Sequence, residues 1–212
     1  MFELVAAAAS GYLLGAIPTA YLLARLRRRD VFELGSGNMG AMNTFRNLGP
    51  ATGAAVLLID IAKGALASYI GLNLPQLSGS VAPTDLTSAG LLTALIAGSA
   101  AVIGHCYSAY VGFRGGKGLA TAFGVALPVY PVPALYTVVL IIALVLIIKN
   151  SDVATLITLI LYPVVTLLAL ERLGWVREAT FLVTTGVIAN CLVGVIKQLQ
   201  VGNSRRRAHC QR

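Results

Sequence analysis

Long apolar stretches, separated by charged or turn-forming residues, are the feature that most limits how this chain can fold. A helix that crosses a lipid bilayer needs about 20 largely apolar residues, because each residue adds about 1.5 Å along the helix axis. The sequence therefore predicts an all-α fold, a polytopic membrane helix bundle of about seven transmembrane helices. The candidate spans are Phe2 to Ala24, Ala51 to Leu72, Thr87 to Ala109, Gly118 to Tyr130, Pro133 to Ile148, Val153 to Leu170 and Ala179 to Ile196.

Composition agrees with a membrane protein and excludes a soluble nucleic-acid-binding domain. Hydrophobic residues make up 57% of the chain and charged residues 11%, whereas a soluble domain has about 25% charged residues. The formal net charge of +8 does not favour nucleic-acid binding, because that function needs a wettable basic surface. The fourth and fifth stretches are short, so they form either two helices or one tight hairpin, with a break at Pro131 and Pro133.

Basic residues are distributed unequally between the predicted connections. The connection after the first span holds Arg25, Arg27, Arg28, Arg29 and Arg46, whereas residues 73–86 hold no Lys or Arg. Since cytoplasmic connections are the ones enriched in Lys and Arg, we expect the N-terminus outside and the C-terminus in the cytoplasm. The first span lacks the basic start of a secretory signal, carries Glu3 and is followed by arginines, so we expect an uncleaved anchor. Residues 1–201 are expected to form a single membrane-embedded domain, followed by a short basic cytoplasmic tail over residues 202–212 that touches anionic lipid heads.

A first glycine loop lies in this basic connection and reads Gly35-Ser36-Gly37-Asn38-Met39-Gly40-Ala41-Met42-Asn43. Alternating glycines let successive N–H groups point into one concavity, which is an anion-binding arrangement. The side chains of Ser36, Asn38 and Asn43 add donors, and Arg46 adds a planar fork that suits phosphate oxygens. Taken alone, such a loop is more often a plain turn, so both interpretations stay open.

A second glycine loop, Arg114-Gly115-Gly116-Lys117-Gly118, follows the third predicted span and is expected on the same face. It combines backbone donors, a positive charge and the start of a helix near Leu119, and each of these favours an anion. It is not a nucleotide P-loop, because the wider glycine spacing and the Ser or Thr after the Lys are missing. Two anion-binding loops on one face favour a transfer between two phosphorylated compounds over the transport of one.

Ionisable residues within predicted spans are functional candidates, because each is costly in hydrocarbon. Asp60 and Lys63 share one helix face at i, i+3, and they form either a structural ion pair or a substrate contact. His105 lies near the end of the third span. It is either a neutral imidazole bonded to a nearby carbonyl or a proton donor or base.

Three segments together resemble the bacterial acyl-phosphate:glycerol-3-phosphate acyltransferases: residues 35–46, Asp60 to Gly64 (DIAKG) and Gly104 to Gly118 (GHCYSAYVGFRGGKG). The resemblance covers roughly residues 1–160 in order and spacing. It implies a seven-helix enzyme of the bacterial cytoplasmic (inner) membrane, with its active site facing the cytoplasm. The implied reaction belongs to phospholipid biosynthesis: a fatty acyl group moves from acyl phosphate to the 1-hydroxyl of glycerol 3-phosphate, giving lysophosphatidic acid and phosphate.

The resemblance also implies site residues. His105 and Lys117 are the catalytic candidates, and the substrate-binding candidates are Ser36, Gly37, Asn38, Asn43, Arg46, Lys63, Gly115, Gly116 and Gly118. N–H groups and a lysine can stabilise the charge that grows on departing phosphate, so direct attack by the glycerol hydroxyl is expected, with His105 or a substrate phosphate oxygen as the base. The expected partners are acyl phosphate, glycerol 3-phosphate and membrane lipids. A monomer is expected, and no metal, nucleotide cofactor or nucleic acid is indicated.

This chain departs from the family pattern at several positions. Ser108 and Met42 stand where a Pro and a Thr are usual, and residues 152–155 (DVAT) stand where a Ser-Leu-x-Ser segment is typical. Asp152 is unfavourable beside phosphate. In a third motif, Leu192 and Val195 stand where the spacing puts a His and an Asn, and the candidates to compensate are Lys197 and Ser151.

Two other functions remain as alternatives. A diverged homologue can act as a transporter or binding protein for a phosphorylated metabolite or anionic lipid, but that predicts broken helices paired across two halves, and the sequence has no such symmetry. A structural partner that docks lipid-synthesis enzymes through its basic loops leaves the paired glycine loops unexplained.

Overall fold

The computed structural model describes residues 1–79, 88–175 and 177–210, and within them all regular structure is helical apart from one isolated bridge between Ser108 and Arg114. The helices are α1 (Phe2–Ala16), α2 (Thr19–Leu26), α3 (Ala41–Leu48), α4 (Pro50–Leu77), α5 (Ser88–Cys106), the short 3-10 helix η1 (Ala109–Val111), α6 (Leu119–Val129), α7 (Pro131–Ile148), α8 (Ser151–Arg172) and α9 (Arg177–Cys210). The predicted all-α class is confirmed.

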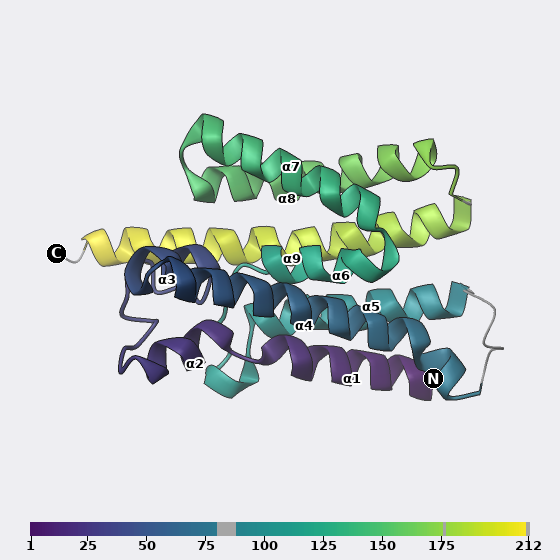
Figure 1. Cartoon of the computed structure of the whole chain (residues 1–212), viewed down its shortest axis with the longest axis horizontal. Helices are drawn as coiled ribbons and strands as arrows, with labels where there is room; N and C mark the ends of the chain where they lie inside the picture. The colour runs from purple at the N-terminus through teal and green to yellow at the C-terminus, as the bar shows by residue number, and fades with distance from the viewer. Residues whose placement is uncertain (80–87, 176, 211–212) are drawn as a thin grey trace.

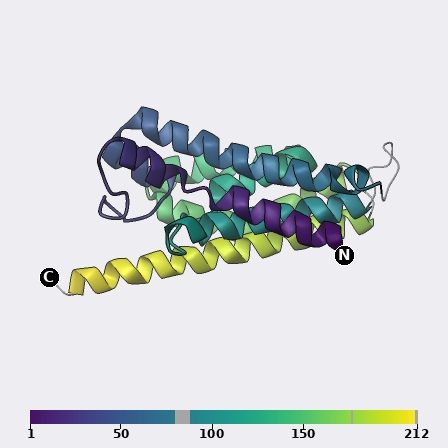
Figure 2. The same ribbon diagram turned by 90° about the horizontal axis from the view of Figure 1, so that it is seen from below.

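The long helices lie along one common direction in a single bundle (Figures 1 and 2). The two termini lie at opposite ends of that bundle (Figure 1). Helix α3 and the turn between α7 and α8 lie at the same end as the C-terminus, which we call the C-terminal end of the bundle. The chain therefore returns several times to the end that carries the first glycine loop.

Among the described residues, five helical segments are long and apolar enough to cross a membrane: Phe2–Leu26, Pro50–Leu77, Ala89–Cys106, Pro131–Ile148 and Ser151–Arg172. Two shorter apolar helices cover Leu119–Val129 and Val183–Lys197. The fourth and fifth predicted spans are thus separate helices, α6 and α7, which meet at the buried residue Tyr130. The lengths and apolar compositions of these helices are those of a helical membrane protein.

The first predicted span is present as the apolar segment Phe2–Leu26, but it consists of two helices and not of one continuous helix. It breaks between α1 and α2 at Ile17 and Pro18, where Ile17 has ψ 115°. Proline cannot donate a backbone hydrogen bond and pushes the preceding residue out of the helical region. The break frees carbonyl groups that other segments use. The carbonyl of Ala16 accepts from Ser108 Oγ at 2.5 Å, and that of Ile17 accepts from Lys63 Nζ at 3.0 Å.

Small residues let neighbouring helices approach closely, as is common in membrane bundles. A Cβ on Gly15 of α1 would lie 2.0 Å from the carbonyl oxygen of Ala101 on α5, and one on Gly124 of α6 would lie 2.0 Å from that of Ile61 on α4. Helices α1, α4, α5 and α6 are therefore held against one another at glycine contacts, which fixes the positions of Asp60, Lys63 and His105.

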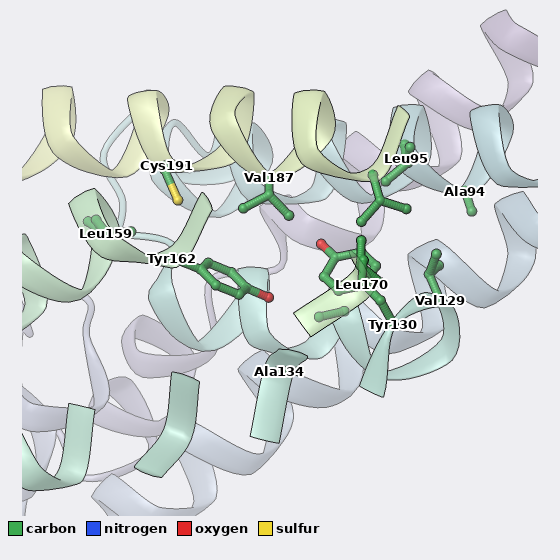
Figure 3. Close-up of a cluster of buried hydrophobic side chains, with 12 residues drawn as sticks. Ala94, Leu95, Val129, Tyr130, Ala134, Leu159, Tyr162, Leu170, Val187 and Cys191 are labelled. Atoms are coloured by element: carbon green, nitrogen blue, oxygen red, sulfur yellow. The ribbon is translucent and has the colours of Figure 1, made fainter. Parts of the chain in front are cut away.

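A cluster of buried apolar side chains joins α6 and α7 to α8 and α9 (Figure 3). Tyr130 and Tyr162 are 1% and 3% exposed and lie beside Val187 and Cys191 of α9. These apolar and aromatic side chains pack closely against one another in the interior of the bundle. The cluster therefore holds α8 and α9 against α6 and α7.

Candidate functional site

The first glycine loop is organised by the buried amide of Asn43, at the start of α3. Asn43 Oδ1 accepts from the backbone N–H of Ser36 at 2.9 Å, and its Nδ2 donates to the carbonyls of Leu34 and Asn38 at 3.0 and 2.9 Å. The backbone N–H of Ser36, which the loop sequence suggested as a donor to an anion, therefore donates to a side chain of the protein instead. Asn43 shapes the loop, which is a role that the spacing of the motif does not reveal.

Two glycines of this loop have left-handed backbone conformations, with φ 51° at Gly35 and φ 64° at Gly37. Such angles favour glycine over any residue with a side chain. The buried Asn38 Oδ1 has no hydrogen-bond partner among the described residues. Asn38 Oδ1 is thus a buried acceptor of the predicted site that no described residue satisfies.

The second glycine loop packs against the last turn of α5. The N–H of Gly116 donates to the carbonyl of His105 at 3.0 Å, and a Cβ on Gly116 would lie 2.1 Å from His105 Nε2. Gly118, at φ 83°, immediately precedes α6, so the predicted helix start at this loop is confirmed. Gly115 and Gly116 are required because the backbone lies directly on His105 and Cys106.

The second glycine loop contacts the segment that leads into the first. The guanidinium carbon of Arg114, in the second loop, lies 3.5 Å from the centroid of the Phe32 ring, which precedes the first loop. A guanidinium over an aromatic face is a favourable cation–π arrangement. The two loops were expected on the same face, and this contact places the second loop beside the residues that precede the first.

Both predicted phosphate-binding cations converge on the first turn of α8. Lys117 Nζ donates to Asp152 Oδ1 at 2.5 Å, and Arg46 Nη2 donates to Ser151 Oγ at 3.4 Å. Asn150 caps this helix, because its Oδ1 accepts from the N–H groups of Asp152 and Val153 at 3.0 and 3.2 Å. The sequence pointed to Arg46, Lys117, Ser151 and Asp152, but it did not identify the Asn150 cap or indicate that the start of α8 joins these residues.

Asp60, Lys63 and His105 form a buried cluster behind the second loop. Asp60 Oδ1 lies 2.8 Å from Lys63 Nζ and 3.6 Å from His105 Nδ1, and it accepts from Thr19 Oγ1 at 3.1 Å. Lys63 also donates to the carbonyl of Ile17 at 3.0 Å. The predicted pairing of Asp60 with Lys63 is observed, and the break at Pro18 supplies two of the cluster's hydrogen bonds.

His105 lies between this cluster and the second glycine loop. Its Nδ1 faces Asp60, and its Nε2 lies against Gly116. A carboxylate beside one imidazole nitrogen orients the ring and favours a proton there, which leaves the other nitrogen to exchange a proton with a substrate. The arrangement can therefore direct a base toward the loop, although the ring is only 5% exposed.

The third motif region lies on α9. Leu192 is 57% exposed, so its side chain points away from the interior, whereas Lys197 is 8% exposed and lies over the ring of Tyr107 at 4.3 Å. Within the described residues, no group of three or more His, Cys, Asp or Glu side chains is placed to hold a metal ion. Lys197 is therefore a buried charged residue that this region of α9 contributes to the interior.

A family model described as glycerol-3-phosphate acyltransferase matches residues 5–201, a range that includes both glycine loops. The chain is 37% identical over 166 residues to the glycerol-3-phosphate acyltransferase of Chlorobium luteolum, covering 78% of this chain and 70% of that protein. It is 42% identical over 159 residues to glycerol-3-phosphate acyltransferase 1 of Dehalococcoides mccartyi, covering 72% of this chain and 71% of that protein.

Two solved structures are similar over almost the whole chain. One is the glycerol 3-phosphate form of PlsY (YgiH), an integral membrane glycerol 3-phosphate acyltransferase, with a TM-score of 0.74 and 27% sequence identity. The other is its lysophosphatidic acid form, with a TM-score of 0.74 and 26% identity. Each match covers 97% of this chain and 92% of the other.

Proposed function

Because this chain belongs to the glycerol-3-phosphate acyltransferase family, we propose that it transfers a fatty acyl group from acyl phosphate to the 1-hydroxyl of glycerol 3-phosphate. The products are lysophosphatidic acid and inorganic phosphate. The observation that carries the proposal is the convergence of Arg46 and Lys117, from two separate glycine loops, on the first turn of α8. Membership in a family of enzymes favours catalysis over the transporter and docking alternatives.

Phosphate binds where the two cations meet the start of α8. The positive end of a helix attracts anions, and α8 is a helix of 22 residues. Arg46 binds the phosphate of glycerol 3-phosphate, because its fork suits two oxygens at once. Lys117 binds the phosphate of the acyl donor, which takes the place of the Asp152 carboxylate. Ser36, Gly37, Asn38 and Asn43 form the wall of the first loop, with Asn38 Oδ1 available to a ligand hydroxyl.

The transfer proceeds by direct attack. The 1-hydroxyl oxygen of the acceptor bonds to the acyl carbon, the bond from that carbon to the phosphate oxygen breaks, and the hydroxyl proton passes to a base. Lys117 and the N–H groups of the second loop stabilise the charge on the departing phosphate. His105, oriented by Asp60, is the base on the protein, and a phosphate oxygen of the substrate is the alternative. Lys63 acts on the site through Asp60, while its predicted contact with substrate stays a prediction.

The proposal includes the topology. The five long apolar helices and the two shorter ones together make seven spans, with the N-terminus outside and the C-terminus and active site in the cytoplasm. The termini at opposite ends of the bundle (Figure 1) support an odd number of spans, and the arginine-rich connection supports the orientation. Residues 1–201 act as one domain in the bacterial inner membrane, as a monomer. Residues 202–212 form the basic tail, which begins within α9.

Phosphate release tests the reaction directly. The purified protein, in a lipidic environment, is given palmitoyl phosphate with and without glycerol 3-phosphate. We expect release that depends on the acceptor, because direct transfer needs the glycerol hydroxyl. Release at the same rate without acceptor would indicate hydrolysis, and no release in either case would contradict the proposal.

A further inference from the structure

Helix α9 carries a buried cation beside the second glycine loop. Lys197 is 8% exposed, and it lies three residues after Gly194, so the two share one helix face. A Cβ on Gly194 would lie 3.3 Å from the carbonyl oxygen of Lys117. This face of α9 therefore packs against the loop that carries Lys117, and the charge of Lys197 is held close to that loop.

The protein provides an aromatic face for this cation. Lys197 Nζ lies 4.3 Å from the centroid of the Tyr107 ring. The ring is fixed in place, because the Tyr107 hydroxyl donates to Gln200 Oε1 at 3.1 Å and its carbonyl accepts from the Tyr12 hydroxyl at 2.9 Å. Partial burial raises the pKa of the Tyr107 phenol, so the phenol stays neutral at physiological pH.

No protein anion balances the charge in the part of the chain that the structure describes. The ion pairs found there join Arg25 to Asp30, Lys117 to Asp152 and Asp60 to Lys63 and His105, and none includes Lys197. A buried ammonium without an anion is unfavourable, and a neutral ring compensates for only part of that cost. A buried lysine without an anionic partner, next to a loop proposed to bind phosphate, favours the binding of an anionic ligand.

We propose that Lys197 binds the phosphate group of a substrate, as a third cation of the site that contains Arg46 and Lys117. This inference rests on the proposed function, because it assigns Lys197 to the same site. The ligand chemistry is a phosphate anion, which either acyl phosphate or glycerol 3-phosphate can supply. Lys197 thereby contributes a charge from α9, where Leu192 and Val195 offer only apolar side chains.

The test compares Lys197→Gln, which removes the charge, with Lys197→Arg, which keeps it. Lys149→Gln is the matched control, because Lys149 is an exposed lysine in the turn between α7 and α8. The KM values for palmitoyl phosphate and for glycerol 3-phosphate are measured separately, together with kcat and the melting temperature of each variant. Glycerol 3-phosphate and inorganic phosphate are also tested for their ability to raise the melting temperature.

Lys197→Gln should raise KM for at least one substrate by about 10- to 100-fold, as expected for a lost charge-assisted hydrogen bond. Its melting temperature should stay the same or rise, because an unbalanced buried charge is removed. Lys197→Arg should retain part of the affinity, and Lys149→Gln should match the unsubstituted protein. A rise confined to palmitoyl phosphate assigns Lys197 to the donor, and one confined to glycerol 3-phosphate assigns it to the acceptor.

Unchanged KM values for both substrates in Lys197→Gln would overturn the inference, whatever the melting temperature of that variant. Failure of the proposed function is a different result, because the unsubstituted protein would then release no phosphate. In that case the thermal shift decides. Stabilisation of the unsubstituted protein by either phosphate compound, lost in Lys197→Gln and kept in Lys149→Gln, supports the inference, and equal stabilisation of all three contradicts it.

Discussion

Lys117 and Asp152 form an ion pair, with 2.5 Å between Nζ and Oδ1, at the point where the second glycine loop meets the first turn of α8. Lys117 is the cation that was predicted to bind phosphate. Asp152 lies in the segment where the family typically has a serine-containing sequence. Under the proposed function, substrate phosphate and the Asp152 carboxylate compete for the same ammonium. We therefore predict that phosphate binding releases Lys117 from Asp152.

Asp152→Asn should lower the KM for palmitoyl phosphate, because the neutral amide no longer competes for Lys117. The pair is partly exposed, with side chains 16% and 36% exposed, so we expect a decrease of about three- to fivefold. Glu33→Gln removes the same charge from an exposed residue before the first loop and should leave KM unchanged. An increase in KM for Asp152→Asn would show that Asp152 helps to bind substrate.

Arg46→Lys should raise the KM for glycerol 3-phosphate about tenfold or more, because an ammonium cannot reproduce the bidentate fork of a guanidinium. Steady-state kinetics with varied acceptor at saturating palmitoyl phosphate measures this change. Arg29→Lys is the control, since Arg29 is an exposed arginine at the same end of the bundle. An unchanged acceptor KM in Arg46→Lys would remove Arg46 from the phosphate site.

Asp60→Asn should destabilise the protein by about 3–5 kcal/mol, because it leaves Lys63 buried without its counter-charge. Thr19→Val removes a hydroxyl that bonds to the same Asp60 oxygen and should cost only about 1 kcal/mol. Thermal unfolding of the two variants in one detergent compares these costs. Equal effects would mean that the ion pair contributes no more than a neutral hydrogen bond.

Gly116→Ala should lower kcat by about 10- to 100-fold, because the added methyl group displaces either His105 or the loop. Gly112→Ala provides the comparison: Gly112 has φ 67°, but a Cβ added there would meet nothing within 4 Å, so the change adds backbone strain without a clash. Its kcat should stay near that of the unsubstituted protein. If both variants lose the same activity, loop strain rather than contact with His105 accounts for the loss.

Features that depend on local sequence were predictable. The apolar lengths predicted the helices. The order of the spans and the distribution of basic residues placed the two glycine loops on one face, and the contact between Arg114 and Phe32 agrees with that placement. The Asp60 and Lys63 pair was predictable because residues at i, i+3 share a helix face.

Features that depend on contacts between distant segments were not predictable. The helix break at Pro18, inside the first predicted span, was not predicted, and nothing in the sequence indicates that the carbonyl of Ile17 accepts from Lys63. The position of Asp152 beside Lys117 depends on how α8 packs against the second loop. Asn43 is a further example, because its spacing indicates a phosphate donor while its amide bonds hold the first loop together.

The most direct test of the central claim is the yield of lysophosphatidic acid from labelled palmitoyl phosphate and glycerol 3-phosphate, measured for the unsubstituted protein and for Lys117→Ala. We expect labelled product from the former and a rate lower by about 100- to 1000-fold from the latter, because one main stabiliser of the departing phosphate is lost. The two proteins should have similar melting temperatures. Equal product from both would contradict the role of Lys117 and the phosphate site at the start of α8.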